Sequence, residues 1–173
     1  RFKSKISKPY QKIAGKSLIE LNLDKASKFK QIKKTVLVYN KKDIKKVKSL
    51  KLQNIKLVCG GYNRQQSAFN GLKYLSKFKS IKNVLIHDVA RPNFSLKLLK
   101  SIIKNMKNAR AVVPKINIED AIKQKIDSSL NEYILGKKRE DLFLTQTPQA
   151  FNLKEIYYLH KTNYKKYKDD DIS

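Results

Sequence analysis

Residues 54–92 read NIKLVCGGYNRQQSAFNGLKYLSKFKSIKNVLIHDVARP and contain a strand pattern, a glycine turn, a helix pattern and a second strand pattern. The apolar runs at 54–59 and 83–87, rich in β-branched residues, predict two buried strands. Between them, apolar side chains recur at helical spacing, at Ala68, Leu72 and Leu75. This succession of strand, helix and strand indicates a βα unit of an α/β fold.

Similar patterns continue on both sides of this unit. The runs TVLVYN at 35–40 and ARAVVP at 109–114 also predict buried strands. Ser95 can cap a helix whose apolar face is formed by Leu99, Ile102, Ile103 and Met106. A last helix is predicted by Leu153, Ile156, Tyr157 and His160. Because the strand runs are apolar almost throughout, we expect a mostly parallel sheet with helices on both faces, in a single domain over residues 1–173.

The composition is strongly basic, with 40 Lys and Arg against 14 Asp and Glu and a formal net charge of +26. A cationic face interleaved with exposed aromatic side chains would indicate nucleic-acid binding. Here Lys is spread along nearly every predicted helix and Tyr and Phe fall mostly on apolar faces, so we expect solvated Lys and no nucleic-acid partner. Arg is rare, and its rigid fork suits specific contacts with anions. The Arg residues are Arg1, Arg64, Arg91, Arg110 and Arg139.

No membrane association is expected, because no stretch approaches the roughly 18 to 20 apolar residues that a membrane span requires. The first residues also lack the apolar segment of a secretory signal. The single cysteine, Cys59, cannot form a disulfide framework, and at a strand end we expect it to be a buried, small hydrophobic residue. These features favour a cytoplasmic protein. The chain starts at Arg1 without Met and stops at Ser173 within an acidic run, so we expect an excerpt of a longer protein.

Polar segments follow the predicted strands at their carboxyl ends, where α/β sheets bind ligands. After the strand at 54–59, a flexible turn from Gly60 to Ser67 leads into a helix N-terminus that carries Arg64. Backbone N–H groups and the helix dipole favour an anion or a nucleotide edge at this position. A plain glycine turn with an N-cap is the alternative interpretation.

Two further segments carry candidate ligand-binding groups. Asp88 and Arg91 follow the next strand. Asp can hold Mg²⁺ or a ribose hydroxyl, and Arg can bind a phosphate through two parallel hydrogen bonds, although a structural ion pair would place the same residues together. The segment TQTPQAF at 145–151 offers hydroxyls and amides that can bind a base or a sugar, or that form only a polar loop closed by proline.

Four segments in this order, GGYNRQQSAFNGL (60–72), HDVARP (87–92), TQTPQAF (145–151) and DDDIS (169–173), closely resemble the signature blocks of 2-C-methyl-D-erythritol 4-phosphate cytidylyltransferases. The resemblance covers essentially the whole chain. It implies a Rossmann-like nucleotidyltransferase fold and a homodimer. It also implies a reaction that joins CTP to a polyol phosphate with Mg²⁺ and releases pyrophosphate, in non-mevalonate isoprenoid biosynthesis. TQTPQAF is most similar to versions fused to the downstream cyclodiphosphate synthase.

The resemblance also implies roles for individual residues. The cations that stabilise the pentacoordinate phosphorus are Arg1 and Lys8. The residues on the nucleotide side are Gly61, Arg64, Ser67 and Asp88, of which Asp88 also faces the metal. The residues on the polyol phosphate side are Arg91, Thr147 and Arg139.

A projecting arm is predicted over residues 115–141, a stretch too long for a simple turn. Apolar residues alternate along it, at Ile116, Ile118, Tyr133 and Leu135, which is typical of two strands. Pairing of the arm with its copy around a two-fold axis would cover these apolar edges. In that arrangement, Arg139 would serve the site of the second subunit.

Some positions depart from the family pattern. The first strand with its glycines, expected before Arg1, and the final strand are both missing from residues 1–173. Tyr62 stands where an Asp is common, and Ala121 stands where a substrate-binding Thr is usual. Because Ala lacks a hydroxyl, either a neighbour such as Glu119 or Asp120 compensates, or the acceptor differs, as in a ribitol-5-phosphate cytidylyltransferase. Ala121 and Tyr62 together also leave open a catalytically inactive dimeric paralogue.

Overall fold

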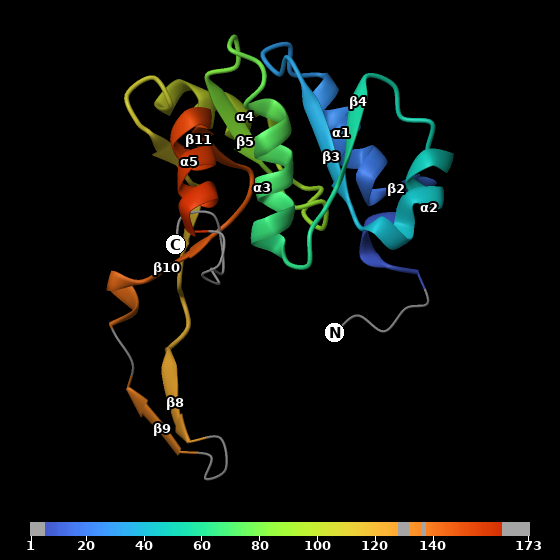
Figure 1. The fold of residues 1–173 in the computed structure, drawn as a ribbon. Helices are drawn as coiled ribbons and strands as arrows, with labels where there is room; N and C mark the ends of the chain where they lie inside the picture. Colours follow the sequence, from blue (N-terminus) through green and yellow to red (C-terminus); the bar gives the residue numbers. More distant parts are fainter. Residues whose placement is uncertain (1–5, 128–131, 136–137, 164–173) are drawn as a thin grey trace.

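A parallel pair of strands forms one part of the sheet in the computed structural model, which describes residues 6–127, 132–135 and 138–163 (Figure 1). Strand β3 (Thr35–Tyr39) pairs in parallel with β4 (Ile55–Cys59), with Leu37 opposite Leu57. The prediction of parallel strands is therefore confirmed for these two runs.

A second group of strands is antiparallel. Strand β11 (Gln149–Asn152) lies between β5 (Asn83–Ile86) and β6 (Ala111–Val112) and runs opposite to both. The predicted strands at 83–87 and 109–114 exist, but the expectation of parallel pairing is wrong for them, because β11 is inserted between them. The sheet is mixed, and the α/β fold class is confirmed.

Helices cover both faces of the sheet, as the strand pattern predicted. Val84 of β5 packs in one cluster with α3 (Arg64–Leu75) and α5 (Leu153–Asn163). Leu85, the next residue, packs against α4 (Leu96–Asn105) on the other face. In β3, Val36 faces the α3 side and Leu37 packs with Ile19 of α1 (Leu18–Ser27). This alternation is the two-residue period of a strand buried on both faces.

Local signals explain where the helices begin. Ser17 and Glu20 form a reciprocal capping box at the start of α1. The Asn63 side chain caps α3, and the Ser95 hydroxyl accepts a hydrogen bond from the N–H of Leu98 at 3.1 Å, which confirms the predicted cap of α4.

Short elements complete the chain. They are η1 (Lys8–Tyr10), β1 (Lys12–Ile13), β2 (Lys16–Ser17), η2 (Lys41–Asp43), α2 (Ile44–Ser49), β7 (Lys115–Asn117), β8 (Lys123–Asp127), β9 (Glu132–Leu135), η3 (Arg139–Asp141) and β10 (Phe143–Thr145). β7 pairs with β10, and β8 pairs with β9 in an antiparallel ribbon that leaves the body of the domain (Figure 1). The range 115–141 contains β7, β8 and β9, with Ile116 in β7 and Tyr133 and Leu135 in β9, whereas Ile118 lies outside these strands.

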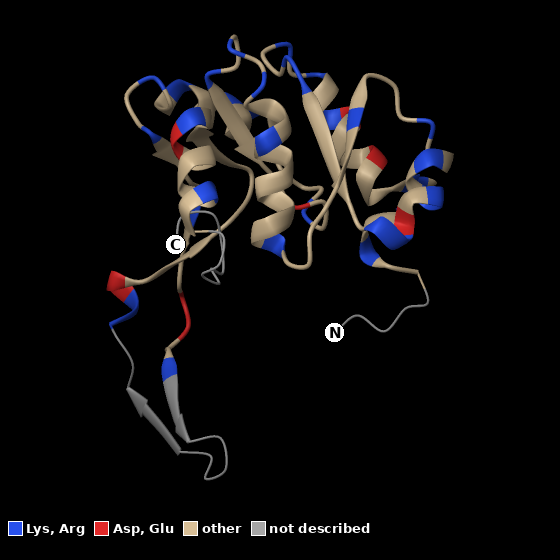
Figure 2. Ribbon diagram, in the orientation of Figure 1, with Lys and Arg blue, Asp and Glu red and all other residues tan. Residues whose placement is uncertain are grey.

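The distribution of charge agrees with the sequence analysis, and the exposure of Cys59 does not. Lys and Arg are distributed over most helices and loops instead of gathering on one element (Figure 2). Among the described helices, none combines the length and the apolar character needed to cross a bilayer. Cys59 is exposed, so the expectation of a buried cysteine is wrong. It is the last residue of β4, which has β3 as its strand partner.

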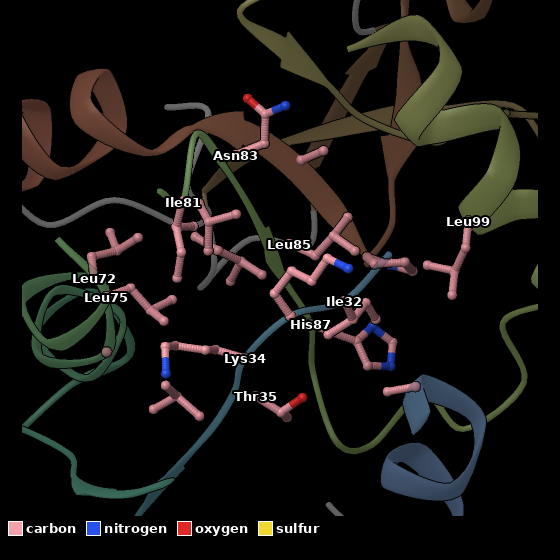
Figure 3. Close-up of a pocket in the computed structure, with 18 of the residues that line it drawn as sticks. Ile32, Lys34, Thr35, Leu72, Leu75, Ile81, Asn83, Leu85, His87 and Leu99 are labelled. Atoms are coloured by element: carbon pink, nitrogen blue, oxygen red, sulfur yellow. The ribbon is translucent and has the colours of Figure 1, made fainter. Parts of the chain in front are cut away.

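A cavity of about 960 Å³ lies between β3 and β5, which are not hydrogen-bonded to each other within the described residues (Figure 3). Consecutive residues of both strands line it, from Thr35 to Val38 and from Asn83 to His87. Because successive side chains of a strand point to opposite faces, such a lining means that the cavity follows the strand edges. Helices close it on either side, through residues such as Leu72 and Leu99.

Candidate active site

Charged residues from two strand ends meet at one edge of the sheet. The Asp88 carboxylate, which follows β5, lies between two guanidinium groups, with Oδ1 3.7 Å from Arg64 Nε and Oδ2 3.8 Å from Arg91 Nε. Arg64 begins α3 just after β4. The carboxyl ends of β4 and β5 therefore share an edge, so β3, β4 and β5 run in one direction. The convergence of Arg64, Asp88 and Arg91 is where the sequence predicted it.

The electrostatics of this cluster suit a phosphate. Two cations face one carboxylate, and the three side chains are between 36% and 46% exposed, so solutes can reach them. The N···O distances are longer than hydrogen bonds, so each ion pair is loose. A net positive, accessible pair of guanidinium groups is a typical phosphate-binding arrangement.

Thr147 connects the third sequence block to this cluster. Its hydroxyl oxygen accepts a hydrogen bond from the backbone N–H of Asp88 at 3.1 Å, and its side chain is buried. The hydroxyl proton is still available for a further acceptor. Thr147 therefore fixes the backbone of Asp88, and its predicted contact with the polyol phosphate remains a prediction.

The glycine turn is held by its own side chains. The Ser67 hydroxyl accepts from the N–H of Gly61 at 3.0 Å and donates to the carbonyl of Asn63 at 2.8 Å. A Cβ on Gly61 would lie 2.3 Å from Cγ of Gln66, so only glycine fits this close approach. Ser67 thus shapes the nucleotide-side loop, and Tyr62 next to it is fully exposed.

His87 lies behind the cluster and was not expected to have a role. Its Nε2 is 2.8 Å from Oδ1 of Asn22 and 3.1 Å from the carbonyl oxygen of Arg91. Burial lowers the pKa of His87, which favours the neutral ring. Nothing in the sequence pointed to Asn22, which is a polar residue within an amphipathic helix and is recognisable only from the contacts that it makes.

Other predicted residues do not join this cluster. Lys8 is exposed in η1, and no hydrogen bond or ion pair between described residues links it to Asp88. Arg139 lies in η3, near the ribbon, where it donates to the carbonyl of Glu119 at 2.7 Å and to the Glu140 carboxylate at 3.1 Å. Arg1 and the acidic run at 169–171 are outside the described residues.

The donor groups fit a magnesium ion that arrives with a substrate. Within the described residues, no group of three or more His, Cys, Asp or Glu side chains is arranged to hold a metal. Asp88 is the carboxylate at the strand-end cluster. Mg²⁺ is commonly bound by one or two carboxylates together with substrate phosphates. The site therefore suits a nucleotide-bound Mg²⁺ and not a metal cage made of protein groups alone.

Comparison with known proteins agrees with the family that the four sequence segments suggested. A family profile described as 2-C-methyl-D-erythritol 4-phosphate cytidylyltransferase matches residues 1–173. The chain belongs to this cytidylyltransferase family. It is 43% identical over 170 residues to a bifunctional enzyme IspD/IspF of Pelagibacter ubique, covering 98% of this chain and 44% of that protein. It is 36% identical over 191 residues to a 2-C-methyl-D-erythritol 4-phosphate cytidylyltransferase of Clostridium botulinum (strain Okra), covering 99% of this chain and 77% of that protein.

Solved structures of the cytidylyltransferase family have the same fold. The 4-diphosphocytidyl-2C-methyl-D-erythritol synthase of Anaerococcus prevotii superposes with a TM-score of 0.82 at 32% identity, covering 96% of this chain and 74% of that one. The bifunctional IspDF of Campylobacter jejuni gives a TM-score of 0.81 at 25% identity, with 99% and 42% coverage. The chain thus spans less than half of the bifunctional relatives and about three quarters of the others. The Rossmann-like nucleotidyltransferase fold implied by the resemblance is confirmed.

Proposed function

We propose that the protein joins CTP to 2-C-methyl-D-erythritol 4-phosphate, giving 4-diphosphocytidyl-2-C-methylerythritol and pyrophosphate for isoprenoid biosynthesis. The observation that carries this proposal is the Arg64–Asp88–Arg91 cluster at the shared carboxyl edge, in a chain of this family. A cytoplasmic location is part of this proposal.

The chemistry needs charge stabilisation more than acid–base groups. A phosphate oxygen of the polyol phosphate attacks the α-phosphorus of CTP in line, a new P–O bond forms, and the bond to the β-phosphate oxygen breaks as pyrophosphate leaves. Negative charge grows on the phosphate oxygens during this step, and preorganised cations stabilise it. In this proposal Arg91 binds the phosphate of the polyol, and Lys8 and Arg1 act on the triphosphate.

The nucleotide would lie over the glycine turn and the start of α3. Gly61 leaves room for the Gln66 side chain that closes the turn, and the first N–H groups of α3 favour an anion or a polar base edge. Asp88 would bind the ribose or Mg²⁺, which would neutralise charge on the triphosphate. The Thr147 hydroxyl proton and Arg139 would contact the polyol phosphate.

A homodimer would bring Arg139 to a substrate. Ile116, Phe143 and Leu144 on the β7–β10 pair are each about half exposed, at 45%, 52% and 56%. A second copy of the same surface around a two-fold axis would cover them. Arg139 lies in η3, shortly before β10 in the chain, and the arm would deliver it to the other subunit.

The cavity between β3 and β5 is a place where a further strand, such as the one expected from the resemblance, would fit. It follows two unpaired strand edges and has helices on both sides, which is the setting of a central parallel strand. We propose that polypeptide preceding residue 1 of the same protein fills it. Amide hydrogen exchange in β3 and β5 should be slower in a protein with that segment than in residues 1–173 alone, and equal rates would contradict the assignment. A final strand after residue 173 stays a prediction.

A different polyol phosphate is the second candidate, because Ala121 is exposed and offers no hydroxyl. Ribitol 5-phosphate is the acceptor that this favours.

The test is pyrophosphate release by the full-length protein with CTP and each polyol phosphate, with and without Mg²⁺. We expect turnover only when CTP, Mg²⁺ and methylerythritol phosphate are all present. Equal rates with ATP, or turnover without a polyol phosphate, would contradict the proposal, and preference for ribitol 5-phosphate would select the second candidate. No turnover with either acceptor would favour the inactive paralogue.

A further inference from the structure

We propose that Asn22 and Lys25 of helix α1 are positioning residues, which hold the turn after β5 so that Asp88 and Arg91 face their substrates. This inference rests on the proposed function. The two side chains are three residues apart, so they share one side of the helix. Asn22 is buried and Lys25 is half-buried, although polar side chains on a helix usually face water.

The Asn22 amide contacts the first part of the turn. Its Nδ2 donates to the carbonyl of Val89 at 2.9 Å and to the carbonyl of Leu18 at 2.6 Å. Its Oδ1 accepts from Nε2 of His87 at 2.8 Å. Both amide donors and the amide acceptor are therefore used within the protein, which is the requirement for a buried amide.

The chemistry of His87 fixes which way this amide points. Nε2 of His87 also lies 3.1 Å from the carbonyl of Arg91, and a carbonyl oxygen can only accept. Nε2 must therefore carry the proton, so the atom of Asn22 that faces it must be the acceptor oxygen. Nδ2 is then directed to the Val89 carbonyl, and this arrangement satisfies the Asn22 amide, whereas Nδ1 of His87 has no hydrogen-bond partner among the described residues.

Lys25 holds the far side of the same turn. Its ammonium group donates to the carbonyl of Pro92 at 2.5 Å and to the carbonyl of Phe94 at 3.3 Å. It also lies 5.5 Å from the centroid of the Phe94 ring, whose edge-to-face partner is His87 at 4.6 Å. Hydrogen bonds from an ammonium group are stronger than those between neutral groups.

Few backbone bonds compete with these side chains for control of the turn. Among the described residues, one backbone hydrogen bond lies within it, from the N–H of Arg91 to the carbonyl of Asp88 at 3.0 Å. The carbonyls of Val89, Arg91, Pro92 and Phe94 all accept from side chains instead. The conformation of the turn, and with it the direction of Arg91, therefore depends on α1.

Loss of the contacts between α1 and the turn should affect the binding of the two substrates differently. The Asp88 backbone has a second anchor, the Thr147 hydroxyl, whereas Arg91 lies in the part of the turn that α1 holds. A displacement of about 1 Å can cost up to about a hundredfold in rate when a reacting group is misplaced. We expect Lys25→Met to raise KM for the polyol phosphate about tenfold or more, with KM for CTP changed much less.

The experiment compares Lys25→Met with Lys28→Met in the full-length protein, because Lys28 is exposed at the end of the same helix and loses the same charge. KM and kcat are measured for each substrate, together with hydrogen exchange of the peptide covering residues 87–94 and thermal unfolding. Lys25→Arg should restore the polyol phosphate KM in large part. Asn22→Asp keeps the acceptor for His87 and loses the donor to Val89, so it should disturb the turn without opening a cavity.

Faster exchange at 87–94 together with the selective rise in KM is the expected result. Unchanged exchange, or faster exchange with kinetic constants equal to those of Lys28→Met, would overturn the positioning role while leaving the proposed function intact. Absence of turnover in the unsubstituted full-length protein would overturn the proposed function instead, and the positioning role with it. If Asn22→Asp fails to fold, the Lys25 variants decide alone.

Discussion

The strand-end cluster and the projecting ribbon each carry an arginine expected to bind the polyol phosphate, but the structure fixes the two in different ways. Arg91 belongs to a turn whose carbonyls are bound by side chains from α1 and from the end of β5. Arg139 is bound to Glu140 next to it and to the carbonyl of Glu119, both within or beside the ribbon. A residue held by the core has a defined position in its own subunit. A residue held only by a projecting segment obtains its final position from whatever the segment meets.

Substitutions at the core-held cluster should have the largest effect. Arg91→Lys keeps the charge but loses the planar fork, so kcat/KM for the polyol phosphate should fall about tenfold or more. Asp88→Asn should damage nucleotide and Mg²⁺ handling instead, seen as a raised KM for CTP. Arg110→Lys is the matched control, because Arg110 is 86% exposed in its ion pair with Glu155.

Full activity in folded Arg91→Lys and Asp88→Asn would show that the loosely paired strand-end charges are structural. The strand-end cluster would then have no role in substrate binding.

Substitutions on the exposed apolar surface of the β7–β10 pair should act through assembly of the dimer. Leu144→Ser places a polar group on this surface. Burial of a Leu side chain contributes about 1.5 to 3 kcal/mol, so the dimer dissociation constant should rise about tenfold or more. Light scattering across a concentration series measures it. Tyr158→Ser, at a residue of α5 that is 65% exposed, is the control and should leave assembly unchanged. A monomer before any substitution would exclude the arm as a dimer contact.

A mixed dimer tests whether Arg139 acts across subunits. Arg139→Ala and Lys8→Ala should each be inactive alone, and a heterodimer of the two should recover activity at one of its two sites. Differently tagged subunits, purified in two affinity steps, give the heterodimer for a pyrophosphate-release assay. No recovery in verified heterodimers would place Arg139 at its own subunit's site or outside catalysis.

The smallest effect is expected far from both regions, at the cap of α1. Ser17→Ala removes the capping box and should lower the free energy of unfolding by about 1 kcal/mol near pH 7. Hydrogen bonds from Ser17 lower the pKa of Glu20. The stabilisation linked to Glu20 is therefore present above the ordinary Glu pKa and is lost as the pH falls through the lowered value. Urea unfolding should show that the difference in free energy of unfolding between wild type and Ser17→Ala becomes smaller in acid. A difference that grows in acid would contradict this account.

The sequence predicted most of the elements but not all of the sheet. β-branched runs at 35–40 and 54–59 identify β3 and β4, although none of the β4 residues is fully buried and two are exposed. β11 was interpreted as part of a polar loop, because it begins with Gln149 after a proline and ends with Asn152. Its Gln, Ala and Phe are nonetheless buried, through pairing with strands that are distant in sequence, and no local pattern encodes that pairing.

The candidate site also contains some residues that the sequence predicted and others that only the structure reveals. Arg64, Asp88 and Arg91 were each predicted to follow a strand, at the carboxyl end where α/β sheets bind ligands, and the structure brings the three together. Asn22 and Lys25 gave no signal, since an Asn and a Lys on an amphipathic helix are indistinguishable in sequence from a solvated surface. Their importance comes from carbonyls about 70 positions later in the chain, which only the folded structure brings within reach.

The position of β11 also bears on the order in which the domain folds. β3 and β4 are close in sequence, so they can pair as soon as both leave the ribosome, whereas β5 and β6 share a partner that is synthesised only at residues 149–152. Closing such a long loop is entropically costly, and non-local strand pairing is slow. The half of the sheet built on β11 should therefore form late. The edges of β5 and β6 stay open to chaperones or to other nascent chains until β11 is synthesised.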